Sequence, residues 1–219
     1  MEKKLIIFGE ENILSDEEME WLKDILVILG KERSVKEIDR EYQKIKKIRS
    51  WPKGVKMLAE LYRGYSKKFL EKIAFKYHKE TFRSEAREVL IELKKRGHLL
   101  GIFTVNPQFI TNPLLKIFPL DFAEGSWFEF KKGKSTGDVK KMVDRYAKVN
   151  LLRKKIKTLG LRKDQVVVIG DLVSPIDFPM VKEAGFFFGF DSKKESLKEV
   201  VEAILKQRNL REILNYKNL

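Results

Sequence analysis

A chain of 219 residues, 43% of them hydrophobic, can bury a substantial core, which excludes a globally disordered protein and favours one large domain or a domain with an insert. The absence of cysteine excludes disulfides, thiolate nucleophiles and cysteine metal sites, and no apolar run approaches the ~20 residues that a membrane span needs. Acidic residues interrupt the apolar run that starts at Leu5, so we expect a cytoplasmic protein with neither signal peptide nor membrane anchor.

Charge is abundant and unevenly placed. Charged residues make up 36% of the chain, chiefly lysine and glutamate, a thermophile-like composition. The net charge of +14 is concentrated in residues 31–83, with 17 basic and 7 acidic residues, and in residues 131–157, with 11 and 2. Such a basic protein attracts phosphorylated ligands, nucleic acid or anionic surfaces, although solvated helix faces would give the same composition.

Four short apolar runs predict buried strands, at residues 5–8, 98–104, 166–170 and 185–190. Helical segments separate them, which favours an α/β fold with a doubly wound, Rossmann-like parallel sheet. Residues 127–130 and the turn after them predict a small hairpin outside the main sheet.

The first two predicted strands are separated by about ninety residues of helical periodicity, far more than the dozen or so that a crossover needs. We therefore expect an all-helical cap at residues 15–80, inserted into a core built from residues 1–14 and 81–219. Ser15 and Glu18 have the spacing of a capping box and predict the first helix of the cap over residues 15–29. The later predicted helices lie at residues 34–48, 66–77 and 84–96.

Several motifs lie at or between the ends of the predicted strands. GIFT ends at Thr104, VVVIGD ends at Asp171, and YAK places Lys148 eighteen residues before the strand that starts at Val166. GKSTGDV occupies residues 133–139, and NLREILNY closes the chain at residues 209–216.

In these motifs and their order the chain resembles the haloacid dehalogenase-like (HAD) hydrolases, and within them the phosphoserine phosphatases, over nearly its whole length. The resemblance implies a phosphomonoesterase fold with a helical cap and a Mg²⁺ cofactor, acting on a small phosphorylated substrate. It also implies that Thr104 binds a phosphate oxygen, that Lys148 neutralises the phosphate and that Asp171 is a metal ligand. Asn106 follows Thr104 and could donate to the phosphate or serve in a turn.

The first motif departs from the family pattern. FGEENIL aligns with Phe-Asp-x-Asp-x-Thr-Leu, so Gly9 stands where the nucleophilic aspartate belongs and Glu11 where the acid/base aspartate belongs. Ile13 replaces the hydroxyl residue. Because glycine has no side chain, we expect the covalent step, in which a carboxylate attacks phosphorus, to be lost.

The fourth motif and the cap depart as well. Pro175 stands at the second metal-binding aspartate, and Asp177, two residues on, would lie on another face of a helix. Magnesium is therefore expected to bind weakly, with Asp171, Glu11 and Asp177 as candidate ligands. In the cap, Glu18 falls where the family recognises the substrate amine, its alternative role being the capping box. Lys56 aligns with the arginine that pairs with the substrate carboxylate and cannot reproduce its bidentate fork.

Three functions stay open. The first is a divergent, weak or inactive phosphomonoesterase that still binds a phosphorylated or anionic ligand. The second is an active Mg²⁺-dependent phosphomonoester hydrolase that uses Glu10 or Glu11 in place of the aspartates. The third is a nucleic-acid or protein-binding module, which requires the two basic segments to form one face. The oligomeric state is not indicated, and His78 and His98 are expected at the surface or at a strand edge rather than on a metal.

Overall fold

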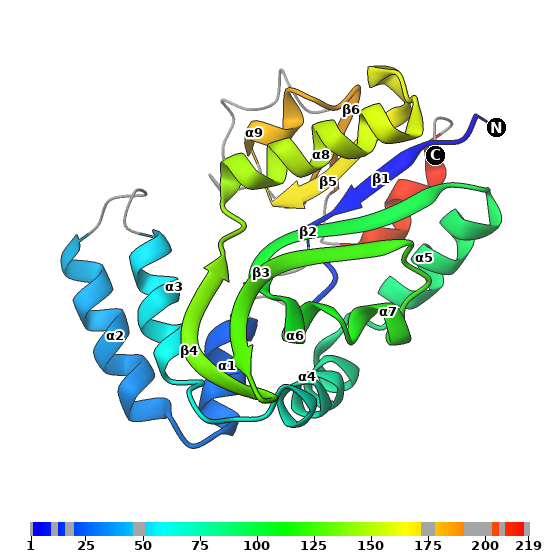
Figure 1. Ribbon diagram of the computed structural model, residues 1–219. Helices are drawn as coiled ribbons and strands as arrows, with labels where there is room; N and C mark the ends of the chain where they lie inside the picture. The colour runs from blue at the N-terminus through cyan, green and yellow to red at the C-terminus, as the bar shows by residue number, and fades with distance from the viewer. Residues whose placement is uncertain are drawn as a thin grey trace.

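The computed structural model describes residues 2–9, 13–15, 20–45, 51–171, 178–190, 203–205 and 209–216. Within these residues the chain forms a seven-stranded sheet with helices on both faces (Figure 1). The strand order is β4-β3-β2-β1-β5-β6-β7. The strands are β1 Leu5–Phe8, β2 Leu99–Pro107, β3 Phe122–Lys131, β4 Lys134–Lys141, β5 Val166–Asp171, β6 Phe186–Phe190 and β7 Ala203–Leu205. All neighbours pair in parallel except β3 and β4, which confirms the expected α/β, largely parallel fold.

Alternate residues of the strands enter two separate apolar clusters. On one face, Ile6 and Phe8 of β1 pack with residues of α5 (Ala86–Lys95). On the other face, Leu5 and Ile7 pack with residues of α8 (Arg145–Leu159) and α9 (Phe178–Val181). Because both faces are covered, a continuous apolar run is the pattern that such a strand requires, which is why β1 and β5 are predictable from sequence.

The hairpin β3–β4 is longer than expected and belongs to the main sheet. Its first strand starts at Phe122, five residues before the predicted start, and pairs in parallel with β2. Glu124, Gly125 and Ser126 interrupt the apolar run there and conceal the strand. The turn is a tight one, with φ of 48° at Lys132 and 75° at Gly133, a conformation that suits a two-residue hairpin loop.

The remaining helices between β1 and β2 are α1 Trp21–Ile28, α2 Glu32–Ile45, α3 Trp51–Glu60 and α4 Lys67–Thr81. The predicted N-cap at Ser15 is wrong for α1, which begins at Trp21 after Glu20, while Ser15 forms an isolated antiparallel bridge with Phe82. A backbone bridge uses the strand conformation and so competes with a cap at that residue. Ser66 caps α4 by accepting the N–H of Phe69, and Gly97 follows α5 with φ of 88°.

The two ends of the predicted cap lie side by side. The N–H of Arg83 donates to the Leu14 carbonyl at 3.0 Å, and the Arg83 Nε donates to the Ser15 carbonyl at 3.1 Å. Adjacent ends are what an inserted unit requires, and they support the division into a core of residues 1–14 and 81–219 and a cap of residues 15–80, which stays a prediction.

The cap also packs on the hairpin. The Gly64 N–H donates to the Ser135 carbonyl at 2.8 Å, and the Lys67 N–H donates to the Gly133 carbonyl at 3.0 Å. Tyr62 is fully buried, and its hydroxyl donates to the Leu22 carbonyl at 2.6 Å. The helical insert and the hairpin are thus one packed body.

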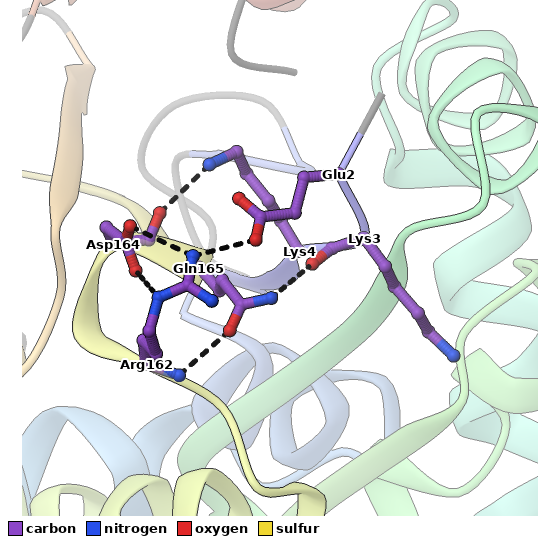
Figure 2. A network of polar contacts seen from close by, with 6 residues as sticks. All are labelled: Glu2, Lys3, Lys4, Arg162, Asp164 and Gln165. Atoms are coloured by element: carbon purple, nitrogen blue, oxygen red, sulfur yellow. Dashed lines mark hydrogen bonds and ion pairs between the residues drawn. The ribbon is translucent and has the colours of Figure 1, made fainter.

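A polar network lies at the amino-terminal edge of the sheet, opposite the edge where the parallel strands end (Figure 2). Arg162 pairs with Glu2 at 2.7 Å and with Asp164, and Lys4 donates to the Asp164 carbonyl at 2.9 Å. Gln165 accepts from the Arg162 N–H at 2.9 Å. These contacts tie the chain start to the loop before β5, so the carboxyl edge is left for the candidate site.

The motif at residues 209–216 forms a 3₁₀ helix, Leu210–Asn215, which packs against α5. None of the helices within the described ranges is long and apolar enough to cross a membrane.

Candidate active site

At the carboxyl edge of the sheet, β1 ends between β2 and β5, which both continue beyond it. Phe8 is aligned with Ile102 of β2 on one side and with Ile169 of β5 on the other. Gly9 follows Phe8, and its N–H donates to the Ile169 carbonyl at 2.7 Å. The position where a nucleophile is expected therefore lies between the ends of β2 and β5, at the edge where parallel α/β sheets bind ligands.

Thr104 and Asn106 lie together in β2, each 2% exposed. The Asn106 N–H donates to the Thr104 Oγ1 at 2.9 Å, which fixes the hydroxyl at the strand end. The strand continues to Pro107, beyond the predicted end at Thr104, and its register with β3 shifts over this stretch.

Gly125 of β3 permits this arrangement. A Cβ there would overlap the Asn106 carbonyl oxygen and come within 2.7 Å of Thr111 Oγ1. Sequence reasoning did not single out Gly125; a glycine inside a strand pattern is the signal of such a close backbone approach.

Lys148, a candidate for the site, lies in the first turns of α8. Asp144 caps this helix, accepting from the backbone N–H of Tyr146 at 3.0 Å and of Ala147 at 2.8 Å. Since α8 runs back toward the start of β5, its first turns lie at the carboxyl edge (Figure 1). Lys148 is only 5% exposed, a rare state for lysine, which is seldom buried without a specific role or partner.

The loops that would complete the site fall outside the described residues. Glu10, Glu11, Glu18 and Asp177 lie in them, so the structure does not place these candidates. The backbone of Asp171 ends β5. Within the described ranges no group of three or more His, Asp or Glu side chains could hold a metal ion, so this part of the chain does not by itself build the implied Mg²⁺ site.

Lys56 and the two histidines are placed clearly. Lys56 is exposed on α3. His78 and His98 are fully buried, which makes the expectation of a surface position wrong, although His98 directly precedes β2 at the amino edge of the sheet. His98 accepts the Lys4 N–H at 3.2 Å, and His78 packs on Trp21 with ring centroids 4.4 Å apart, so both are core residues.

The basic segments are spread over several faces. The start of α4 meets the hairpin turn through the bridge between Ser66 and Lys134. However, α2 and α8, which carry many of the other lysines, lie at different sides of the molecule (Figure 1). The single basic face that a nucleic-acid module requires is not formed by these elements.

Comparison with known proteins identifies relatives of this chain. Residues 28–182 match the family model of the haloacid dehalogenase-like hydrolases. The chain is 31% identical to the phosphoserine phosphatase of Methanocaldococcus jannaschii over 217 residues, which cover 98% of this chain and 97% of that protein. It is 26% identical to the phosphoserine phosphatase of Archaeoglobus fulgidus over 95% of this chain and 58% of that protein.

Solved structures agree with the sequence relatives. A substrate-bound phosphoserine phosphatase complex superposes with a TM-score of 0.77 at 30% identity, with 99% of both chains covered. A phospho-aspartyl intermediate analogue of a phosphoserine phosphatase gives 0.76 at the same identity and coverage. With its parallel sheet and its polar residues at the ends of β2 and β5, the chain belongs to the haloacid dehalogenase-like hydrolases and is phosphoserine phosphatase-like.

Proposed function

We propose that this protein is a divergent phosphomonoesterase that binds a small phosphorylated or anionic ligand at the carboxyl edge of the sheet and has lost the covalent step of its relatives. The observation that carries the proposal is Gly9, which occupies the strand end between β2 and β5 without a side chain. Thr104, Asn106 and Lys148 supply the ligand contacts.

The chemistry of these groups suits a phosphate. A lysine ammonium is a compact cation with three donors, and its attraction to a dianion is stronger in a buried site than in water. A hydroxyl and an amide can each donate to phosphate oxygens. Binding needs only these fixed donors, whereas transfer of the phosphoryl group to the protein needs a carboxylate at the position of Gly9.

In this proposal the metal ligands and the cap residues contribute less to ligand binding than Thr104, Asn106 and Lys148. Asp171, Glu11 and Asp177 would hold Mg²⁺ weakly, and the metal would supply positive charge to the phosphate when bound. Glu18 and Lys56 would contact the rest of the ligand. Since Lys56 lacks the arginine fork, a ligand other than phosphoserine is favoured.

Replacing Lys148 by Met tests the ligand site. Loss of one buried charge-assisted contact is expected to weaken binding of inorganic phosphate or O-phosphoserine about 10- to 100-fold, measured by isothermal titration calorimetry. The matched control is Lys157→Met, an exposed lysine on the same helix, which is expected to bind like the unmodified protein. Equal weakening in both variants would remove Lys148 from the site.

An active hydrolase is the second candidate, since the chain is 31% identical to a phosphoserine phosphatase over nearly its whole length. In that case Glu10 or Glu11 replaces the aspartates. The test is hydrolysis of a chromogenic aryl phosphate and of O-phosphoserine in the presence of Mg²⁺. Our proposal predicts that Glu11→Gln hydrolyses these compounds no more slowly than the unmodified protein does. Turnover by the unmodified protein that Glu11→Gln abolishes would establish the active enzyme instead.

A further inference from the structure

A groove of about 900 Å³ runs along α4, away from the candidate active site. Its other wall is the segment around α7 (Leu114–Ile117), which packs against α4 (Figure 1). The groove brings together residues 66–75 and 112–116, two segments that are well separated in the sequence.

The floor of the groove is apolar and open. Phe69 and Leu115 are 45% and 43% exposed, and Phe75 and Pro113 lie beside them. Large apolar side chains gathered in one concave surface commonly mark a binding site for another molecule.

Lysines stand on both walls of this floor. Lys68 and Lys72 belong to α4 and Lys116 to α7, and all three are exposed. The acidic residue of the lining, Glu71, accepts from Asn112 Nδ2 at 3.0 Å and thereby links the two walls. The groove therefore has three lysines and one carboxylate among its lining residues, and that carboxylate is hydrogen-bonded within the groove.

We propose that this groove binds an amphipathic helix of a partner protein whose apolar stripe is flanked by acidic residues. An apolar floor with lysines on both walls is complementary to such a helix, with apolar anchors at positions i, i+3 or i+4, and i+7 in the groove and carboxylates facing the lysines. The part of α4 that lines the groove, residues 67–75, offers about 13 Å of wall, enough for two to three turns of a helix.

Two other occupants fit less well. A second copy of this chain carries the same net charge of +14 and would be repelled. Single-stranded nucleic acid binds through stacking platforms, whereas Leu115 and Pro113 offer aliphatic surface and the ring of Phe69 already stacks on Tyr65, 6.0 Å between centroids.

The test uses a fluorescein-labelled designed helix with leucines at the anchor positions and glutamates beside them, and measures anisotropy with the full-length protein at low salt. Its scrambled isomer has the same composition and charge without the apolar stripe. We expect the patterned peptide to bind at least 10-fold more tightly than the scrambled one. Leu115→Glu is expected to abolish this preference, because it places an anion on the apolar floor.

Charge is tested separately, on variants of the rim. Lys68→Ala/Lys72→Ala is expected to weaken the patterned peptide about 5- to 10-fold at low salt and much less at high salt. The matched control, Lys154→Ala/Lys157→Ala, removes the same charge from exposed positions on α8 and is expected to leave binding within 2-fold. Thermal melting verifies that every variant is folded.

Three results would each overturn the proposal. The first is equal binding of the patterned and scrambled peptides, and the second is equal weakening by the two lysine pairs. The third is tighter binding of a 15-nucleotide oligothymidylate, lost in Phe69→Leu, which would assign the groove to nucleic acid. Since no groove residue belongs to the candidate active site, phosphate binding measured in parallel reports separately on the proposed function.

Discussion

Gly9→Asp is expected to give this protein phosphatase activity about 100-fold above that of the unmodified chain. The substitution places a carboxylate at the strand end between β2 and β5, where its oxygen can attack phosphorus as the bond to the leaving oxygen breaks. Removing a nucleophile typically lowers kcat by about 10⁶. We expect only part of such a factor to return, because Ile13 and Pro175 also depart from the family pattern.

The aspartate would stand directly after β1, at a residue whose backbone is hydrogen-bonded to β5. Its N–H remains bonded to the Ile169 carbonyl, and this bond holds the strand end in register. Folding of the variant is verified by its melting temperature, since a buried carboxylate carries a desolvation cost.

The assay for Gly9→Asp follows hydrolysis of an aryl phosphate with Mg²⁺ present and detects the acyl phosphate by its mass. Gly9→Asn is the matched control, with the same shape and no nucleophilic oxygen. A folded Gly9→Asp protein that binds phosphate yet is no more active than Gly9→Asn would show that the loss of chemistry extends beyond the nucleophile.

Much of the core was predictable because buried parallel strands carry an unusual sequence pattern. The runs at β1, β5 and β6 are apolar at successive positions, and a strand buried on both faces is the simplest structure that accounts for them. The carboxyl edge as the place of the site followed from the same logic, since a residue just past such a run must lie there. Thr104 and Lys148 are both buried, but their roles come from the family resemblance and stay predictions.

Features that depend on contacts distant in sequence were not predictable. Ser15 has the local pattern of an N-cap, but its bridge to Phe82 joins segments 67 residues apart and fixes another conformation. The start of β3 is hard to recognise in the sequence because of Gly125. A glycine is needed there because the backbone lies close to the Asn106 carbonyl. The groove along α4 is invisible for the same reason, because its walls meet only in the folded protein.

The histidines illustrate how the environment decides the chemistry of a residue. From sequence, His78 lies in a lysine-rich helix and is indistinguishable from a surface residue. In the fold it is enclosed by Trp21 and Phe82, and its Nε2 lies 2.8 Å from the Ile110 carbonyl. A carbonyl only accepts, so Nε2 carries the proton, while Nδ1 has no hydrogen-bond partner among the residues that the structure describes.

This environment is expected to make the protein lose stability in mild acid. Burial lowers the pKa of His78 to about 4 from 6.5, opposed by the bond to the Ile110 carbonyl. In this pH range His78 is therefore protonated in the unfolded chain and neutral in the folded protein. As a result, the free energy of unfolding falls as the pH drops from about 6.5 to about 4. Above this window both states are neutral and His78 contributes no pH dependence.

The expected loss attributable to His78 is about 2.5 kcal/mol between pH 7.5 and pH 4.5, from the two pKa values and the linkage relation. It is measured by urea denaturation at several pH values, as the difference between the unmodified protein and His78→Gln, whose amide can still donate to the Ile110 carbonyl. Using the difference removes the contribution of the carboxylates, which titrate in both proteins. The comparison variant His98→Gln is expected to show a smaller change, since burial and the charges of Lys4 and Arg96 lower the pKa of His98 less. Parallel stability–pH curves for His78→Gln and the unmodified protein would mean that His78 takes up its proton in the folded state, through an opening of the packing around Trp21.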